Sequence, residues 1–210
     1  MQLLDIIGGK IVRLVTKSIV NPCRRLRLKN KNFTLIASNC NGTYLLYDLK
    51  LKYNTPTINL YIVPRDFVRF CANIDYYLGL ELTFVQGHGV DYPVGMLDDV
   101  TIHFMHYASI DNARDKWNQR LKRVNKDNIF FLMAERDGCT YHTLRAFDEL
   151  PVRNKLVLTH KSYPEFSSAY KISGFEREQQ VGELHEYKHN FSCLRYLYDF
   201  NFVEWFNSNL

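Results

Sequence analysis

Hydrophobic residues along the chain fall into short runs with strand-like alternation and longer segments with helical spacing. The first pattern predicts strands over residues 33–38, 55–63, 81–86, 100–105, 128–134 and 155–159. The second predicts helices over 64–78, 110–124, 140–150 and 192–207. The Gly-rich run 87–95 is predicted as a loop, and residues 21–32 as a basic connector. The run 128–134 is apolar throughout, which is typical of a central strand covered on both faces. The order predicts an α/β fold with a mainly parallel, Rossmann-like sheet and helices on both faces.

The first 31 residues differ from this body. Leu3, Leu4, Ile7, Ile11 and Leu14 recur at helical spacing, with Lys10, Arg13 and Lys17 on the other side. The chain has a net charge of +5, to which residues 1–31 contribute about +7 and the rest about −2. The sequence therefore predicts a basic amphipathic N-terminal segment over 1–31 and a single α/β domain over 32–210.

Two roles for the N-terminal segment remain open at this stage. Its apolar face and its charge suit an anionic membrane surface, although it is too short and too charged to span a bilayer. The same pattern suits a helix that packs on the body. Five cysteines without a CxxC pair favour a cytoplasmic location, at the inner face of the cell membrane if the segment is an anchor. The slightly acidic body argues against a nucleic-acid partner.

Polar residues that directly follow the predicted strands are the candidates for chemistry, because ligands bind at the carboxyl ends of strands in such sheets. Asn39, Cys40 and Gly42 follow the first strand and suit substrate binding, through an anion held at a helix start. The alternative is a tight polar turn with a buried cysteine. His106 and Tyr107 end the strand at 100–105, where His106 could act as a general acid or base and Tyr107 could bind substrate. The alternative is a structural, hydrogen-bonded histidine.

The turn after the most apolar strand holds two acidic residues. Glu135 and Asp137 flank Arg136 and resemble the acidic pair with which sugar-nucleotide transferases hold a divalent metal. This interpretation makes both carboxylates ligands of Mg²⁺ or Mn²⁺, with Asp137 also catalytic and Arg136 binding substrate. The alternative is a solvated turn or an ion pair. Cys40 with His106 as a nucleophile and its base is a further hypothesis, and it requires the two side chains within hydrogen-bond reach.

Five segments carry a family resemblance: 38–42, 53–70, 92–107, 116–131 and 136–140. Together they resemble a bacterial domain-of-unknown-function family whose members are usually labelled exopolysaccharide biosynthesis proteins. The match runs from Phe33 to Gly174. The resemblance implies an α/β fold and a setting among capsule or cell-surface polysaccharide enzymes.

These observations lead to two hypotheses. The first is a transferase in exopolysaccharide, capsule or other cell-surface glycan assembly, which takes an activated sugar such as a nucleotide sugar and transfers it to a glycan acceptor. The second is a non-catalytic accessory protein of the same pathway. The first requires Asn39, His106 and the turn 135–137 to border one cleft.

Overall fold

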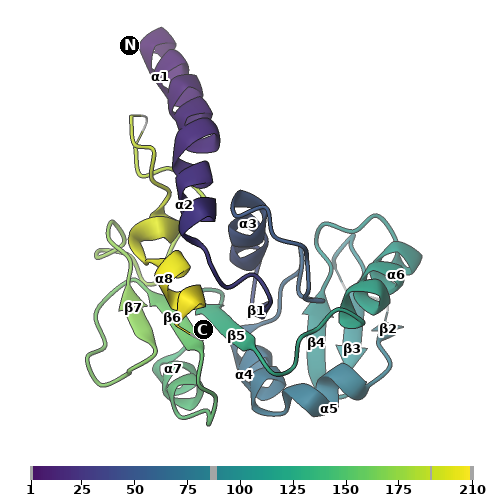
Figure 1. The fold of residues 1–210 in the computed structure, drawn as a ribbon. Helices are drawn as coiled ribbons and strands as arrows, with labels where there is room; N and C mark the ends of the chain where they lie inside the picture. Colours follow the sequence, from purple (N-terminus) through teal and green to yellow (C-terminus); the bar gives the residue numbers. More distant parts are fainter. Residues whose placement is uncertain (1, 86–88, 190, 209–210) are drawn as a thin grey trace.

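The computed structural model describes residues 2–85, 89–189 and 191–208, with the side chains of residues 2–7 left out. In chain order the elements are α1 (Gln2–Val15), the π-helical turn η1 (Thr16–Val20), α2 (Asn21–Arg27), β1 (Thr34–Ala37), α3 (Asn41–Asp48), α4 (Pro64–Ala72), α5 (Ile74–Gly79), β2 (Thr83–Val85), β3 (Val94–Leu97), β4 (Val100–His103), α6 (Ile110–Leu121), β5 (Ile129–Ala134), α7 (Tyr141–Asp148), β6 (Lys155–Thr159), β7 (Ala169–Lys171), the 3-10 turn η2 (Tyr196–Asp199) and α8 (Phe202–Asn207) (Figure 1).

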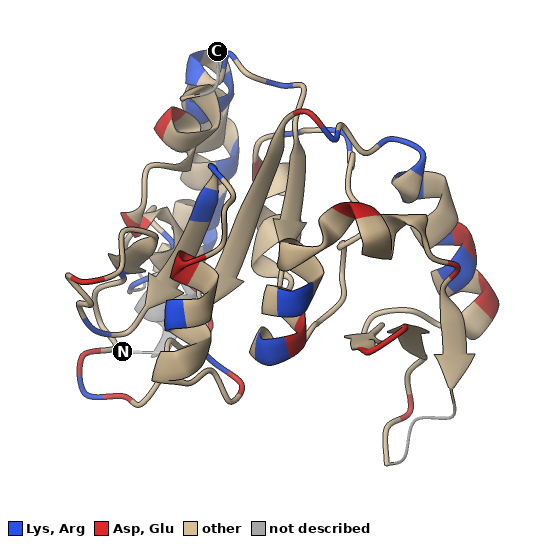
Figure 2. Cartoon of the chain, turned by 90° about the horizontal axis from the view of Figure 1, so that it is seen from below, with Lys and Arg blue, Asp and Glu red and all other residues tan. Residues whose placement is uncertain are grey.

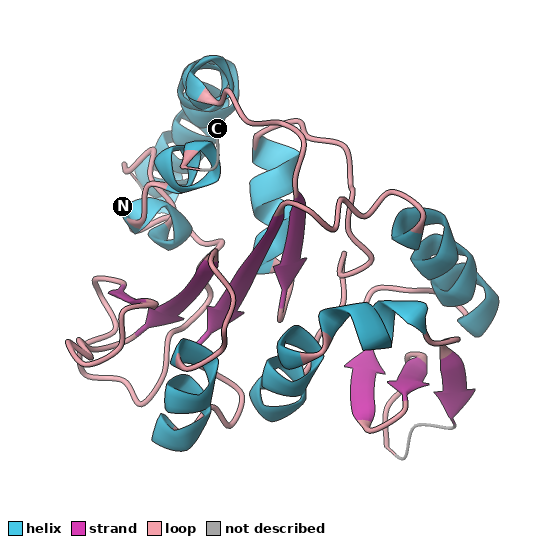
Figure 3. Ribbon diagram, turned by 60° about the horizontal axis from the view of Figure 1, so that its bottom comes forward, coloured by secondary structure: helices cyan, strands magenta, loops and turns pink. Residues whose placement is uncertain are grey.

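The strands form two separate sheets (Figure 3). One has four strands in the order β1-β5-β6-β7, and every neighbouring pair is parallel. The other has three antiparallel strands in the order β2-β3-β4. The mixed α/β class predicted from the sequence is confirmed, but the antiparallel sheet was not predicted.

Several segments differ from the sequence prediction. The helix predicted over 192–207 is limited to η2 and α8. Residues 55–63 form no strand, and their sheet-like contacts are a bridge between Tyr61 and His103 and a hydrogen bond from the Ile62 N–H to the Ser38 carbonyl. In contrast, β3 lies at the end of a glycine-containing segment that was predicted as a loop. It pairs with β2 and β4, and such long-range pairing overrides weak local propensity. Residues 86–88, at the junction of the strand and loop predicted there, lie outside the described residues.

Side chains of the parallel sheet alternate between two apolar clusters. On β5, Phe130 and Leu132 point to one cluster, and Phe131 and Met133 to the other. All four are at most 3 % exposed. This period-2 division, with both faces buried, explains why the strand is apolar throughout.

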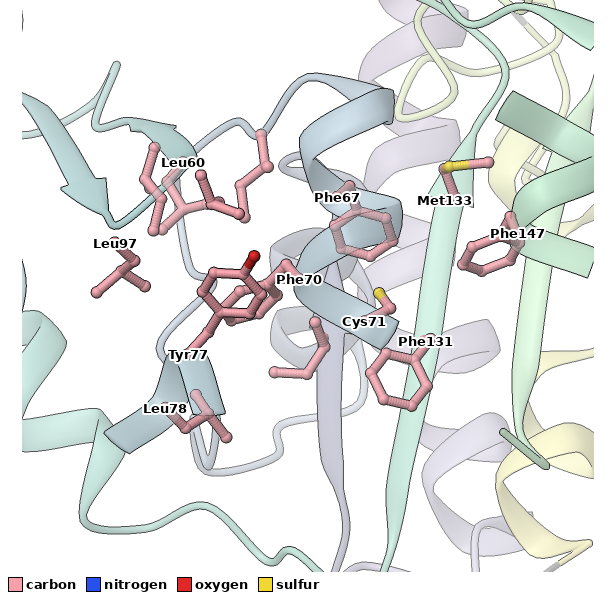
Figure 4. Packing of buried hydrophobic residues seen from close by; sticks show 14 of the residues in the cluster. Leu60, Phe67, Phe70, Cys71, Tyr77, Leu78, Leu97, Phe131, Met133 and Phe147 are labelled. Carbon is pink, nitrogen blue, oxygen red and sulfur yellow. The ribbon is translucent and has the colours of Figure 1, made fainter. Parts of the chain in front are cut away.

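Helix α4 joins the two sheets into one core. It contacts both β4 and β5. Its Phe67, Phe70 and Cys71 are buried between Leu97, from the antiparallel sheet, and Phe131 of β5 (Figure 4). The helix therefore fixes the ends of β4 and β5 relative to each other.

The N-terminal helix runs without interruption through α1, η1 and α2 and extends away from the body, beside residues 185–189 and 191–195 (Figure 1). Its buried face contains Gly8, Val12 and Thr16. A Cβ atom on Gly8 would lie 2.6 Å from Phe191 Cε1, and Thr16 Oγ1 donates to the Cys193 carbonyl at 3.2 Å. No helix among the described residues is long and apolar enough to cross a membrane.

The part of the predicted apolar face that the structure describes does not pack on the body. Ile11 and Leu14 are 56 % and 64 % exposed and share the outward surface with Lys10, Arg13 and Lys17. The side chains of Leu3, Leu4 and Ile7, which were part of the predicted apolar face, lie outside the described residues. Residues 21–27, predicted as a basic connector, are helical.

The segment after α2 is attached to α8. Asn207 Oδ1 accepts from the N–H groups of Lys29 and Asn30, and its Nδ2 donates to the Arg27 carbonyl. Phe33 stacks on Phe206 with ring centroids 4.4 Å apart. These contacts bring segments that are distant in sequence together over the β1 and β5 face.

Candidate functional site

A cleft of about 400 Å³ lies at the carboxyl ends of β1 and β5 and beside the end of β4. Parallel strands place the loops that follow them at one edge of a sheet, which is the usual place for a ligand in this architecture. The cleft is lined by Asn39, Cys40, Asn41, Tyr44, Tyr61, Tyr92, Met105, His106, Arg136, Asp137, Glu183 and His185. Five of these residues were candidates from the sequence: Asn39, Cys40, His106, Arg136 and Asp137.

The loop after β1 supplies Asn39 and Cys40. Asn39 Oδ1 accepts from the Asn41 N–H at 3.1 Å, which closes the turn into α3. Burial, followed by the negative charge of Glu183, raises the pKa of the Cys40 thiol. A raised pKa disfavours the thiolate, so the electrostatics oppose Cys40 as a nucleophile.

Gly42, predicted to bind substrate, does not line the cleft. A Cβ atom there would lie 2.5 Å from Ala37 Cβ. The structure therefore gives Gly42 a packing role: its missing side chain lets α3 approach β1 closely.

The turn after β5 places Arg136 and Asp137. Asp137 has φ +56° and Gly138 has φ +83°, and an aspartate tolerates this left-handed conformation better than most residues. The Asp137 N–H donates to Gln180 Oε1 at 2.9 Å. The turn is thus held to the segment that carries Glu183 and His185.

Arg136 lies between two carboxylates of the cleft. Its Nε donates to Asp137 Oδ2 at 3.0 Å and its Nη2 to Glu183 Oε1 at 2.8 Å. The Arg136 guanidinium lowers the pKa of Glu183. Burial alone would lower the pKa of Arg136, but the hydrogen bond to Glu183 and the charge of Asp137 outweigh it, so this pKa is raised. The Arg136 guanidinium and the Glu183 carboxylate are therefore held in their charged forms.

His106 is exposed at the mouth of the cleft, whereas its neighbour Tyr107 is not part of it. The Tyr107 hydroxyl donates to the Ile58 carbonyl at 2.6 Å and accepts from Arg120. The predicted substrate-binding role of Tyr107 is replaced by a structural one. His103 does not line the cleft either.

Aromatic rings form much of the remaining wall. The rings of Tyr44 and His185 stack at 4.6 Å with an interplanar angle of 4°. Burial and the charge of Asp137 raise the pKa of Tyr61 to about 12. The Tyr61 phenol is therefore neutral over the physiological range and can donate a hydrogen bond.

Glu135, which was predicted to hold a metal together with Asp137, does not line the cleft. It is 4 % exposed, and its Oε2 accepts from the His160 N–H at 2.9 Å and lies 2.6 Å from His160 Nδ1. Its Oε1 accepts from the Tyr163 hydroxyl. Both oxygens are thus occupied on the inner side of the strand end. Within the described chain, no three His, Cys, Asp or Glu side chains are grouped as metal ligands.

Sequence reasoning missed Tyr44, Tyr61, Tyr92, Glu183 and His185. Tyr44 lies on α3, less than two helical turns after the polar loop that follows β1. This position could have indicated that its side chain lines the cleft. Glu183 and His185 come from a segment without helix or strand, where no periodic pattern marks a position.

Comparison with known proteins places the chain in a family. A family model described as "Domain of unknown function (DUF1919)" matches residues 11–207. The chain belongs to the DUF1919 family. A relative from Haemophilus influenzae (strain Rd), described as an uncharacterized protein, is 45 % identical over 188 residues, which cover 90 % of each chain. The DUF1919 match includes the whole cleft and also the helix from Ile11 onward.

Proposed function

We propose that this DUF1919 chain is a transferase that binds an activated sugar in the cleft and passes it to a hydroxyl of a growing glycan. The observation that carries the proposal is the convergence of Asn39, His106 and Asp137, from three strand ends, in one cleft of about 400 Å³. Amides, carboxylates and aromatic rings are the groups that pair with sugar hydroxyls and cover the apolar faces of sugar rings. The resemblance to exopolysaccharide biosynthesis proteins supports the setting in surface-glycan assembly.

In the proposed reaction, different residues of the cleft have different roles. The acceptor hydroxyl forms a bond to the anomeric carbon while the bond from that carbon to the diphosphate oxygen breaks. His106 accepts the hydroxyl proton, because an exposed imidazole at the mouth can reach an incoming acceptor. The diphosphate leaves with the bonding electron pair, and the Arg136 guanidinium faces its charge. Asp137 holds Arg136 and orients the sugar hydroxyls.

A carboxylate-held divalent ion does not fit this cleft. Glu135 is turned away, and the other two carboxylates already hold Arg136 between them. The guanidinium supplies positive charge where the sequence predicted Mg²⁺ or Mn²⁺. We therefore expect sugar-nucleotide binding that does not depend on either metal.

The test is a binding and transfer screen with nucleoside-diphosphate sugars, each with and without Mg²⁺ or Mn²⁺. We expect His106→Gln to lower transfer by about 100-fold, the scale of a general base, with little loss of sugar-nucleotide binding. Asp137→Asn should weaken both. His142→Gln is the matched control, since His142 is exposed on α7 and does not line the cleft. A screen in which no sugar nucleotide binds or reacts contradicts the proposal and favours the accessory role.

A further inference from the structure

A second hollow, of about 940 Å³, lies between the N-terminal helix, the end of α3 and the segment 185–195. It adjoins the cleft at His185, which lines both. Its walls carry several basic side chains beside apolar surface: Arg13, Leu14, Thr16, Lys17, Ser18, Asn21, Arg25, Leu46, Tyr47, Asp48, Lys50, Leu51, Tyr53, His185, Glu186, Tyr187 and Arg195. We refer to it as the basic groove.

The acidic residues of the basic groove do not cancel its positive charge. Asp48 is 3 % exposed, and its Oδ2 already pairs with Arg195 Nη1 at 3.2 Å and Tyr198 Oη at 3.0 Å. With Glu186 also counted, five basic side chains face two acidic ones. Arg13, Lys17 and Lys50 have no acidic partner within 4 Å among the described residues.

The backbone is irregular at two of these lysines. Lys50 has φ +52° just after α3, a position where glycine is usually found. Lys17 belongs to η1, a five-residue π-helical turn, and such turns are rare and occur frequently at functional sites. Thr16 and Ser18 of the same turn also line the groove. Both irregularities therefore lie on the groove wall.

Arg195 contributes a donor that no protein group uses. Its side chain is 17 % exposed, and its Nε is buried without a hydrogen-bond partner among the described residues. The rings of Tyr44 and Tyr187 lie 5.5 Å and 5.4 Å from the guanidinium carbon. An unpaired buried donor is costly, and it belongs to an arginine that lines the groove.

We propose that the basic groove is a second binding site, which takes the phosphate group of a phosphate-bearing molecule. Lysines and arginines from separate elements suit a multiply charged oxyanion, because arginine pairs with phosphate in a bidentate manner and lysine adds point charge. The volume of about 940 Å³ admits more than the phosphate alone. The phosphate can belong to a soluble ester or to a lipid headgroup. The proposal stands apart from the reaction assigned to the cleft.

The test measures binding of inorganic pyrophosphate to the full chain by calorimetry. The groove variant is Lys17→Gln with Lys50→Asn, since asparagine tolerates the conformation of Lys50. The control variant is Lys29→Gln with Lys31→Gln, which removes the same charge from exposed residues outside the groove. We expect the groove variant to bind pyrophosphate at least about tenfold more weakly, because it loses two charge-assisted contacts. The control should stay within about twofold of the unmodified chain.

Vesicle co-sedimentation then identifies the source of the phosphate. The probes are vesicles of phosphatidylcholine alone and vesicles of phosphatidylcholine with phosphatidylglycerol. Binding to the second only, lost in the groove variant and displaced by pyrophosphate, assigns a lipid headgroup. Pyrophosphate binding without vesicle binding assigns a soluble ester. The proposal is overturned if the chain binds neither probe, or if the groove and control variants weaken binding equally.

Discussion

Glu135 and Arg136 are neighbours in sequence but act on opposite sides of one strand end. Arg136 faces the cleft, while Glu135 holds His160 and Tyr163 on the inner side. From the sequence alone, a carboxylate at the end of a buried strand can either line a cleft or form internal hydrogen bonds. The hydrogen-bond partners, which follow β6, decide between them, and they are 25 and 28 residues away.

Replacing Glu135 should therefore lower stability far more than replacing a charged residue of the cleft does. We expect Glu135→Ala to lower the free energy of unfolding by roughly 3 kcal/mol, because His160 and Tyr163 would lose a buried charged partner. The comparison is Asp137→Asn, whose ion pair is partly exposed and whose loss should cost less than about 1 kcal/mol. Guanidinium denaturation of both variants measures the difference. Equal losses would show that Glu135 is not a structural residue.

The pKa of Tyr61 gives a prediction for alkaline pH. The pKa of a tyrosine in an unfolded chain is about 10. Burial, followed by the negative charge of Asp137, raises the pKa of Tyr61 in the folded chain to about 12. A raised folded pKa means that the contribution to stability is complete below pH about 10 and is lost as the pH rises toward about 12. We expect Tyr61→Phe to show a shallower fall in unfolding free energy over this window, by about one proton, and no change of slope at neutral pH. Identical slopes for the two chains in denaturation at high pH would contradict it.

At the scale of elements, β5 was readable from the sequence as a central strand covered on both faces, because every position is apolar. The strands β3 and β7 were not predicted, and their pairing with neighbouring strands defines them. The same contrast holds for the cleft. Its strand-end residues follow from the geometry of parallel strands, while Glu183 and His185 are placed only by contacts such as that between Val181 N–H and the Glu135 carbonyl.

The seating of α3 on β1 depends on Gly42. We expect Gly42→Ala to destabilise the fold by about 1–3 kcal/mol, because the new methyl group would meet Ala37 at 2.5 Å and push α3 away. Gly79→Ala is the control, since no atom lies within 4 Å of its added Cβ, and it should change stability by less than about 1 kcal/mol. Thermal unfolding compares the two. A Gly42→Ala chain as stable as the control would show that α3 can shift without cost.

At the scale of the whole molecule, the N-terminal helix and the body are more closely connected than composition indicates. The charge asymmetry predicted a separate segment, yet Leu28 is 2 % exposed and Asn30 is buried beside α8. The charged side chains of a segment indicate which of its surfaces face water. They say little about which of its backbone groups form hydrogen bonds with the body. Charged residues elsewhere are mixed in sign, as along α6, where Arg114 pairs with Asp111 (Figure 2).

The attachment of α8 to the segment after α2 has a consequence for synthesis on the ribosome. Asn30 and Phe206, whose amide and carbonyl pair, are 176 positions apart. Until Phe206 has been synthesised, the apolar face of β1 and β5 that it covers remains exposed to solvent. Nascent chains in such a state are prone to aggregation and are bound by chaperones. A ribosome that stalls shortly before α8 would therefore leave an almost complete chain whose apolar face on β1 and β5 is still exposed and prone to aggregation.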